Sequence, residues 1–321
     1  MIYRVLVVGL GRIGIGYDLS LDPARWILTH ARAFQQHPRF QLTGGVDPDP
    51  GRCRLLNEHY GVAGWTSLHQ ALSVAHPDVV VVAAPTSEHA ATVRNLLEAI
   101  SLRAILSEKP LAYDAAQGAA IERLCRDKNC DLFVNYMRRS DPGVIEVKRR
   151  LDSGAIQTPI RGVVWYSKGL IHNGSHFFNL LQYWLGSMKE FGIIRPGRLW
   201  AGEDPEPDVQ VEFDHGTITF LAAQEEDFSH YTVELIARNG RLRYEDGGRT
   251  ILWQPAVPDP SLEGYTVLRS TPEVVPSDMK RSQWNVAAEL AEALDGRPAH
   301  LCDGSDGLRT LEALSLIRGK L

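Results

Sequence analysis

The sequence predicts an α/β fold with two domains: residues 1–136 as an N-terminal Rossmann domain with a doubly wound parallel sheet, and residues 137–321 as a second domain. Three observations support this prediction. A β-rich run leads directly into a glycine-rich loop, strand and helix patterns alternate as far as Tyr136, and several β-runs separated by turn residues follow. The length of 321 residues also exceeds the roughly 100–200 residues of one domain.

The first strand and the loop after it carry a dinucleotide-binding fingerprint. Residues 2–8 read IYRVLVV, and the next six read GLGRIG, so a G-x-G-x-x-G motif directly follows a strand. Gly9 permits the tight turn, Gly11 lets backbone N–H groups approach a pyrophosphate, and Gly14 lets the next helix pack on the strand. A glycine turn without a ligand is the alternative interpretation. The residues that we assign here to cofactor binding are Gly9, Gly11, Arg12, Ile13 and Gly14.

The segment after the glycine loop is too long for a single first helix. Residues 15–38 read IGYDLSLDPARWILTHARAFQQHP, which predicts a loop at 18–23 and a helix over 26–36. We therefore interpret residues 15–25 as an insertion, close enough to the cofactor to cover it.

The second strand, residues 40–46, ends at Asp47, which is the position of the adenosine ribose in this kind of fold. The spacing from Gly14 is longer than the roughly 20 residues expected, and the insertion accounts for the excess. A carboxylate there accepts hydrogen bonds from ribose hydroxyls and repels a 2′-phosphate, which favours NAD over NADP. Two alternatives stay open: Asp47 or Asp49 caps the next helix, and Arg52 with Arg54 admits NADP.

The alternation then continues to the end of the first domain. Ligands bind such sheets at the carboxyl ends of the strands, and AAPTSEH, residues 83–89, leaves one of these ends. We place Pro85 and Thr86 on the nicotinamide side and include His89 among the cofactor-binding residues, with a helix start as its alternative role. The predicted elements are helix 52–60, strand 78–83, helix 89–99, strand 103–106, helix 114–128 and strand 131–136.

The next strand ends in SEKPLA, which contains Glu108, Lys109 and Pro110. A residue before proline avoids the helical region, and an X-Pro bond can adopt the cis form, so Lys109 is held in a fixed pose at the crevice of the sheet. This arrangement can aim an ammonium group at a ligand. The alternative is a solvated lysine beside a helix start.

Together, GLGRIG, AAPTSEH, SEKPLA and the later NGSH segment resemble the glucose-fructose oxidoreductase / inositol dehydrogenase (Gfo/Idh/MocA) family over essentially the whole chain. The resemblance implies a C-terminal α/β domain built on a large, open, mostly antiparallel sheet. It also implies that Lys109 faces substrate and nicotinamide. We assign Glu108, its neighbour, to cofactor binding.

The second half of the chain is consistent with that architecture. A helix is predicted over 141–151, and the tail contains two further helical patterns, QWNVAAELAEALDG and DGLRTLEALSLIRGKL. The strand patterns between them are IRGVVWYSKG, DVQVEFD, TITFLAAQ, HYTVELIAR, RLRYED and TILWQ.

The segment KGLIHNGSHFFNLLQYWLG, residues 168–186, contains two histidines four residues apart. The resembled family has D-x-G-x-H-x-x-D here, and alignment on Gly174 places His172 at the first acid, His176 at the histidine and Asn179 at the second acid. His176 therefore inherits the proton-transfer role beside Lys109, and either of the two can be the proton-transfer group. Our catalytic set is Lys109, His176 and His172. His172 replaces a negative charge by a group that is neutral or cationic near pH 7, and Asn179 cannot act as a base.

Histidines four residues apart on a helix can also share a metal ion. Asn173 and Gly174 predict a helix start between the two histidines, no glutamate lies between them, and no third ligand is near in sequence. We therefore predict no metal site, and plain structural histidines remain the other alternative. The apolar positions that follow are predicted to form the buried face of a helix: Phe177, Leu180, Leu181 and Trp184.

Further substrate contacts are predicted where the chain passes between the domains and in the strand before the histidine segment. An arginine at the crossing can hold a carboxylate or phosphate, or form an interdomain salt bridge. Tyr166 and Lys168 are expected on one face of a strand, lining the substrate site or facing solvent. The full substrate-binding set is Asn135, Tyr136, Arg138, Lys168, Asn173 and Asn179, catalytic residues aside.

Composition limits the partners. Lys and Arg number 34 against 39 Asp and Glu, a net charge of −5 without long runs of one sign, so we expect a small carbohydrate-like molecule and neither nucleic acid nor membrane. The four cysteines show no pairing pattern, which fits a reducing cytoplasm, and no secretion signal or bilayer-length apolar run is present. An open sheet with one exposed face predicts a homodimer or homotetramer.

These features predict an NAD-linked oxidoreductase, with NADP as the other cofactor, that moves hydride to or from an oxygen-bearing carbon of a sugar, cyclitol or nucleotide-sugar. The substrate class follows from the resemblance alone. The absence of both family acids keeps a second hypothesis open, a non-catalytic dinucleotide-binding regulator on the same fold, and a metal-dependent lyase or hydrolase using both histidines is a third.

Overall fold

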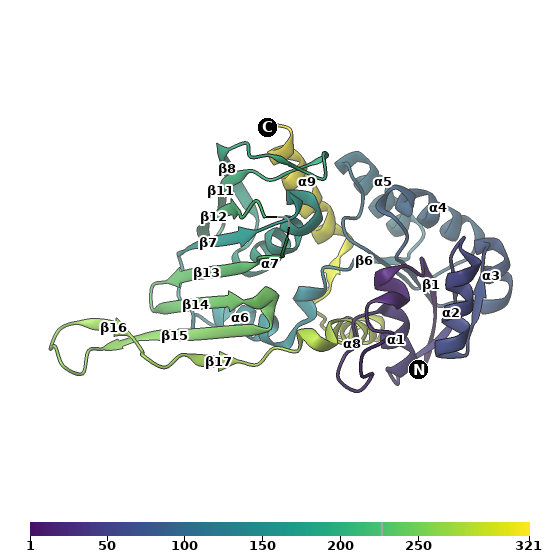
Figure 1. Cartoon of the computed structure of the whole chain (residues 1–321), viewed down its shortest axis with the longest axis horizontal. Helices are drawn as coiled ribbons and strands as arrows, with labels where there is room; N and C mark the ends of the chain where they lie inside the picture. Colours follow the sequence, from purple (N-terminus) through teal and green to yellow (C-terminus); the bar gives the residue numbers. More distant parts are fainter. Residues whose placement is uncertain (226) are drawn as a thin grey trace. The chain divides into compact units, whose positions relative to one another are not determined.

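The computed structural model describes residues 1–225 and 227–321, and the chain divides into two units (Figure 1). The first unit contains Met1–Ser140 and Lys280–Glu312. The second contains Asp141–Met279 and Ala313–Leu321.

The first unit is built on a seven-stranded sheet with the order β18-β6-β5-β4-β1-β2-β3. Six strands run parallel, and β18 pairs antiparallel with β6. The order reverses at β1, which has β2 on one side and β4 on the other, and ligands bind doubly wound sheets at such a reversal. The strands are β1 (Tyr3–Val8), β2 (Phe40–Val46), β3 (Ala63–Trp65), β4 (Val79–Val82), β5 (Ala104–Ser107), β6 (Asp131–Val134) and β18 (Cys302–Asp303).

Helices cover both faces of this sheet, which confirms the predicted doubly wound Rossmann fold. Val5 and Val7 of β1 belong to a core shared with α1, α2 and α8, whereas Leu6 and Val8 belong to a core shared with α3, α4 and α5. These helices are α1 (His30–Gln36), α2 (Pro50–Tyr60), α3 (Leu68–Ala75), α4 (His89–Ala99), α5 (Ala115–Asp127) and α8 (Ser282–Leu294). Short helical turns are η1 (Arg12–Gly16), η2 (Thr86–Glu88), η3 (Met137–Ser140) and η6 (Met279–Arg281).

The helix predicted over 26–36 is shorter than expected and begins at His30. The backbone of Ile27 instead donates to Lys280 O and accepts from Gln283 N, and the side chain of Arg32 donates to Trp26 O. Hydrogen bonds to a distant segment thus replace the first helical turn. Neither β3 nor α3 is predicted by the sequence patterns above.

Residues 280–312 pack with the first unit although they follow the second along the chain. Val286, Ala287 and Leu290 of α8 lie in the same core as β1, and β18 extends the first sheet at β6. The compact units therefore differ from a simple division at residue 136, because the tail returns to the first sheet.

The second unit contains a nine-stranded sheet with the order β16-β15-β14-β13-β7-β12-β11-β8, and β17 pairs with β15. β7 and β12 run parallel and the other pairs run antiparallel, as the resemblance implies. β8, which the sequence patterns do not predict, forms one edge. The strands are β7 (Ile160–Tyr166), β8 (Met188–Arg195), β11 (Asp208–Phe213), β12 (Gly216–Ala222), β13 (Thr232–Ala237), β14 (Gly240–Glu245), β15 (Thr250–Pro258), β16 (Thr266–Leu268) and β17 (Glu273–Val275). A separate two-stranded sheet pairs β9 (Leu199–Trp200) with β10 (Asp204–Pro205).

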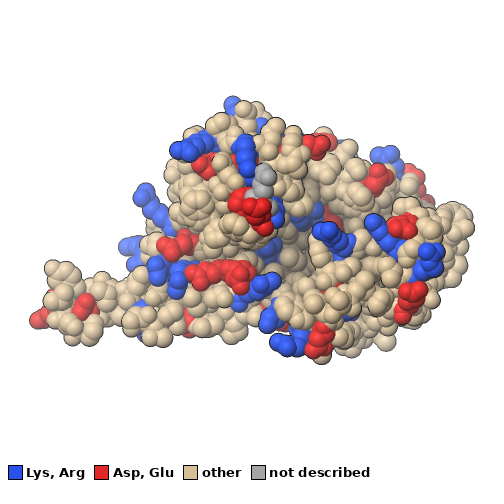
Figure 2. Space-filling view, viewed as in Figure 1, with Lys and Arg blue, Asp and Glu red and all other residues tan. Residues whose placement is uncertain are grey.

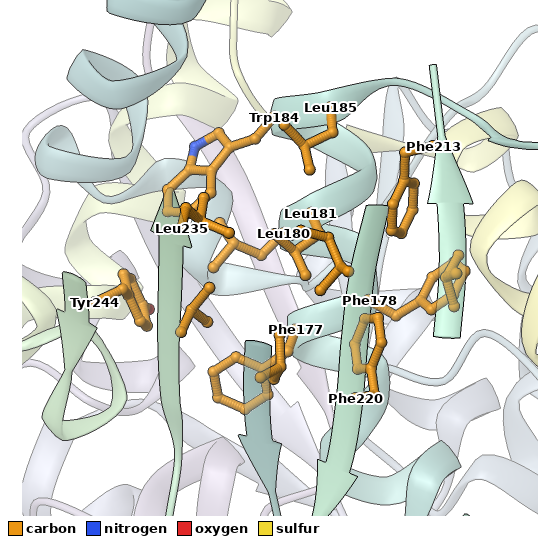
Figure 3. Close-up of a cluster of buried hydrophobic side chains, with 14 of the residues drawn as sticks. Phe177, Phe178, Leu180, Leu181, Trp184, Leu185, Phe213, Phe220, Leu235 and Tyr244 are labelled. Atoms are coloured by element: carbon orange, nitrogen blue, oxygen red, sulfur yellow. The ribbon is translucent and has the colours of Figure 1, made fainter. Parts of the chain in front are cut away.

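Helix α7 (Ser175–Leu185) supplies much of the core under this sheet. Figure 3 shows its Phe178 beside Phe213 of β11 and Phe220 of β12, with ring centroids 5.5 and 5.8 Å apart. The predicted buried face of this helix is confirmed, because Phe177, Leu180, Leu181 and Trp184 are all buried. The unit also contains α6 (Pro142–Asp152), and α9 (Gly304–Arg318) ends in it.

Acidic and basic side chains are interspersed on the face shown in Figure 2. On the outer side of the second sheet, Arg241 lies 3.7 Å from Glu234 and Arg243 lies 3.0 Å from Glu245. Of the helices in the described part of the chain, none combines the length and apolar character needed to cross a membrane.

Candidate functional site

The glycine loop leaves the carboxyl end of β1 and packs tightly against the end of β4. Gly9 has a φ of +100°, and a Cβ there would lie 2.4 Å from the carbonyl carbon of Ala83. A Cβ on Gly14 would lie 2.2 Å from Gly9 O. A Cβ on Gly11, by contrast, would meet only Arg52 Nη1, at 3.9 Å. The space beside Gly11 is therefore open, as the close approach of a pyrophosphate requires, and the loop fits a dinucleotide.

Asp47 is buried and ties the glycine loop to the end of β2. Its Oδ2 accepts hydrogen bonds from Leu10 N at 2.9 Å and Arg52 Nη1 at 3.2 Å, and its Oδ1 accepts from Asp49 N. The alternative role of helix cap belongs to Asp49, whose side chain accepts from Gly51 N. A carboxylate offers about four acceptor positions, so about one remains on Asp47 for a ribose hydroxyl.

Arg52 gives the adenosine side of the loop a positive charge. Its guanidinium is about half exposed and lies beside both Asp47 and Asp49. A cation at this place attracts a 2′-phosphate, whereas a carboxylate repels it, so the two residues act in opposite directions on cofactor choice.

His89 lies at the start of α4 and is buried, and its ring contacts the protein backbone. Nδ1 lies 3.1 Å from Leu111 O and Nε2 lies 3.0 Å from Ala84 O. The ring thereby links the loop after β4 with the loop after β5. Pro85, which is exposed, and Thr86, which is half-buried, precede it. The roles of all three toward a cofactor stay predictions.

Glu108 follows β5 and is the centre of a polar network. Its Oε1 accepts hydrogen bonds from His30 Nε2 at 2.8 Å and from Asn135 Nδ2 at 2.6 Å, and its Oε2 lies 3.4 Å from Lys109 N. Burial would raise the pKa of Glu108, but the hydrogen bond and charge of His30, the hydrogen bond of Asn135 and the charge of Lys109 hold it below its ordinary value. The carboxylate is therefore ionised near neutral pH. The Lys109–Pro110 bond is cis.

The other residues predicted at the crossing between domains are buried in the first unit. Asn135 also donates to Gln283 Oε1 at 3.3 Å, and Tyr136 lies in the core shared with α3, α4 and α5. Arg138 is buried in η3, and its neighbour Arg139 forms an ion pair with Asp306 at 2.6 Å. Asn135 thus contacts another predicted site residue, Glu108.

In the second unit, two acids hold the backbone of the histidine segment: Glu206, which is buried, and Asp204, which is half-buried. The segment begins with a helical turn, η4 (Gly169–Gly174). Asp204 accepts hydrogen bonds from Ile171 N and His172 N, and Glu206 accepts from the N–H groups of residues 168 and 169. Burial raises the pKa of Asp204, while these backbone hydrogen bonds act in the opposite direction.

Neither acid was among the predicted site residues. The sequence signal that could have found them is EDPEPD, residues 203–208, because acids between prolines in a loop need N–H donors when they are buried.

The two histidines have different surroundings. His172 is exposed, and its ring stacks on Trp200 with centroids 4.9 Å apart. His176 is half-buried in the first turn of α7, which begins at Ser175. The α-helix therefore begins between the two histidines as predicted, but it directly continues the helical turn η4, which contains His172. Within the ranges that the structure describes, no three His, Cys, Asp or Glu side chains are grouped to hold a metal ion.

The predicted substrate contacts in this unit have protein partners. Asn173 Nδ2 donates to the Tyr231 hydroxyl at 2.7 Å, Lys168 Nζ donates to Ser229 Oγ at 2.8 Å, and Asn179 is buried. The expectation that Tyr166 and Lys168 share a strand face is wrong. β7 ends at Tyr166, whose side chain lies in the core, and Lys168 has a left-handed backbone with φ of 63°.

Comparison with known proteins gives a family match in the first unit. Residues 3–136 match the GFO_IDH_MocA model, an oxidoreductase family with an NAD-binding Rossmann fold. The chain is 26% identical over 239 residues to scyllo-inositol 2-dehydrogenase (NAD(+)) of Bacillus subtilis (strain 168), covering 66% of this chain and 64% of that protein. It is 32% identical over 173 residues to inositol 2-dehydrogenase 1 of Saccharopolyspora erythraea, covering 48% of each. Both matches span less than two thirds of the relative's length.

Solved structures share the fold over nearly the whole chain. An NAD binding oxidoreductase from Klebsiella pneumoniae superposes with a TM-score of 0.79 at 16% identity, covering 99% of this chain and 96% of that one. The WlbA dehydrogenase of Bordetella pertussis, solved with NADH and UDP-GlcNAcA, gives 0.76 at 18% identity, covering 99% and 95%. At these identities the similarity establishes the fold.

The glycine loop generates a paired prediction. Gly11→Ala should change the free energy of unfolding by about 1 kcal/mol or less, because its Cβ enters open space. The same change should weaken NADH binding about tenfold or more, because the methyl group occupies the approach to the pyrophosphate. Gly9→Ala should instead destabilise the fold by about 2–5 kcal/mol through backbone strain and overlap with Ala83. Urea unfolding measures the stability of each variant, and fluorescence titration measures its NADH affinity. Unchanged NADH affinity in Gly11→Ala would contradict the assignment of Gly11 to cofactor binding.

The network around Glu108 generates a pH prediction. Because its pKa is lowered in the folded state, the carboxylate contributes stability that is present above the unfolded pKa of about 4.3 and is lost as the pH falls through the folded pKa. Glu108→Gln should therefore lower the free energy of unfolding by about 1.5–3 kcal/mol at pH 7. The difference from wild type should shrink as the pH falls below about 4. Urea unfolding of wild type and Glu108→Gln at pH 7 and below about pH 4 tests this. A difference in the free energy of unfolding that is the same at both pH values would show that the charge of Glu108 is not the cause.

Proposed function

We propose that this chain, which belongs to the Gfo/Idh/MocA family of NAD-binding oxidoreductases, transfers hydride between a nicotinamide dinucleotide and a hydroxyl or keto carbon of a sugar, cyclitol or nucleotide-sugar. The observation that carries the proposal lies within the first unit. The open space beside Gly11 follows β1, and Lys109 follows β5. Both lie at the same carboxyl edge, because β1, β4 and β5 are successive neighbours in one parallel sheet.

The cofactor is NAD in this proposal, with NADP as the weaker ligand. Gly9, Gly11 and Gly14 would hold the pyrophosphate, and Asp47 would accept a hydrogen bond from the adenosine ribose with its remaining lone pair. A bound nicotinamide supplies the hydride chemistry. Arg52 reduces the repulsion of a 2′-phosphate, so Arg52→Ala should widen the preference for NADH over NADPH.

Lys109 and His176 are the proposed proton-transfer groups. A hydroxyl loses a proton when its carbon loses hydride, and an amine or a neutral imidazole can take it and return it in the reverse direction. His172 occupies the place of an acid in the resembled family, but its exposed ring is stacked on Trp200. We therefore assign His172 to substrate contact in preference to proton transfer.

The substrate class is supported by what the relatives' names state. Both curated relatives described above are inositol dehydrogenases, and the WlbA structure contains a nucleotide-sugar. Ring polyols present many hydroxyls, which suits the amide and imidazole groups of Asn173, His176 and Asn179.

We extend the proposal to a homodimer or homotetramer in the cytoplasm. The outer side of the nine-stranded sheet exposes Trp165 and Ile236, which a second subunit can cover. Cys53, Cys125, Cys130 and Cys302 are free and buried, as suits a reducing compartment.

Lys109→Ala is the direct test. We expect it to lower turnover about 10²-fold or more on any sugar, inositol or nucleotide-keto-sugar that the wild type converts, because a proton-transfer group is lost. NADH binding by fluorescence should stay within about twofold, since the glycine loop is unchanged. Lys128→Ala, an exposed lysine of the same unit, is the matched control. NADH binding by the wild type without turnover of any panel member would favour the regulator, and absence of NADH binding would contradict both hypotheses.

A further inference from the structure

The inserted segment between the glycine loop and α1 is fixed to its own unit by a buried carboxylate. Asp18 is fully buried, and its Oδ2 accepts hydrogen bonds from Leu28 N at 2.7 Å and Thr29 N at 3.0 Å. Its Oδ1 accepts from the Thr29 hydroxyl at 2.8 Å, and Arg32 Nε lies 3.5 Å away. Four groups thus converge on one carboxylate just before His30, the first residue of α1. Asp18 therefore holds the backbone immediately before α1.

A second set of contacts joins the same segment to α8. Ile27 pairs through its backbone with Lys280 O and Gln283 N, and the Lys280 ammonium lies 5.3 Å from the ring centroid of Trp26. Arg32 Nη1 also donates to the carbonyls of Leu21 and Trp26. Residues 18–29 are therefore hydrogen-bonded to the rest of their own unit at both ends, and we call this segment the brace.

His30 extends these contacts to the loop after β5, which carries Lys109. Its ring is fully buried, and its Nε2 donates to Glu108 Oε1 at 2.8 Å. Asn135 donates to the same oxygen and also to Gln283, which is bonded to Ile27. These hydrogen bonds form a closed network, here called the circuit. It runs from the inserted segment through α1, the loop after β5, the end of β6 and α8, and returns through Gln283 to Ile27 of the inserted segment.

The circuit restrains the residue next to the proposed proton-transfer group from two directions. Glu108 N donates to Val82 O, which fixes the main chain, and the hydrogen bonds from His30 and Asn135 fix the side chain. A side-chain donor that is itself buried and braced loses little entropy in this contact. The backbone of Lys109 begins directly after this fixed point.

We infer that His30 is a positioning residue for Lys109, held in place by Asp18 of the inserted segment, so that the insertion acts as a structural brace for the loop that carries Lys109. The inference rests on the proposed function for the role of Lys109. The brace itself is a property of the fold, and it can be measured without turnover.

The test uses four variants of the full chain. Asp18→Asn removes the buried charge, and Asp22→Asn, an exposed aspartate of the same segment, is its matched control. His30→Leu removes the donor to Glu108, whereas His30→Gln keeps an N–H donor at a similar reach. Each variant is measured by amide hydrogen exchange with mass spectrometry, by NADH titration and by turnover.

We expect Asp18→Asn and His30→Leu to raise exchange in the peptide covering residues 104–113 by about tenfold, which corresponds to the loss of one hydrogen bond. Turnover should fall about tenfold to 10²-fold in both, because small misplacements of a catalytic group carry costs of this size. NADH affinity should stay unchanged in both. Asp22→Asn should match wild type, and His30→Gln should recover most of the loss seen in His30→Leu.

Three results of the exchange measurement would overturn the inference: exchange at 104–113 equal in Asp18→Asn and Asp22→Asn, exchange raised throughout the first unit, or no recovery of protection in His30→Gln. If His30→Leu does not fold, the comparison of exchange at 104–113 between Asp18→Asn and Asp22→Asn decides whether the brace exists. Absence of wild-type turnover would count against the proposed function alone, since the exchange measurement still decides whether the brace exists. Normal turnover in Asp18→Asn beside an active wild type would overturn the inference and leave the proposed function intact.

Discussion

The contact of Gly9 with the end of β4 is the constraint on which the candidate site depends. With no side chain between them, the backbone of Gly9 lies against Ala83, so the loops after β1 and β4 leave the sheet side by side. Gly14 then packs on Gly9 O, and Leu10 N reaches the Asp47 carboxylate at the end of β2. A larger residue at Gly9 would separate these strand ends, and the open space beside Gly11 exists because they are close.

Buried polar groups complete the same edge of the sheet. Glu108 lies after β5 and is ionised although its side chain is only 14% exposed, because two donors from different elements share its Oε1. His89 joins the loops after β4 and β5 through backbone carbonyls. Carboxylates have a similar role in the second unit. Asp204 and Glu206 accept hydrogen bonds from backbone N–H groups and so hold the backbone of the histidine segment in place. In both units, carboxylates hold irregular backbone where helices and strands end.

Much of the first unit could be predicted from sequence because its signals are local. The glycine spacing, the strand β2 and the helix α4 follow from patterns within a few residues, and both elements have the predicted bounds. The return of α8 to the first sheet could not be predicted this way, since it depends on core packing between residues far apart. No motif marks His30 or Asp18, because their partners are set by tertiary contacts. Lys168 illustrates the same limit: alternation places it with Tyr166, but the strand ends at Tyr166 and the backbone of Lys168 is left-handed.

The location of the dinucleotide is the central claim, and amide hydrogen exchange of the wild-type chain with and without NADH tests it most directly. The account predicts protection by NADH in peptides that cover residues 9–16, 44–52, 83–89 and 107–111, the loops at the carboxyl edge of the first sheet. Protection of other segments with these peptides unchanged, or no protection at saturating NADH, would contradict it.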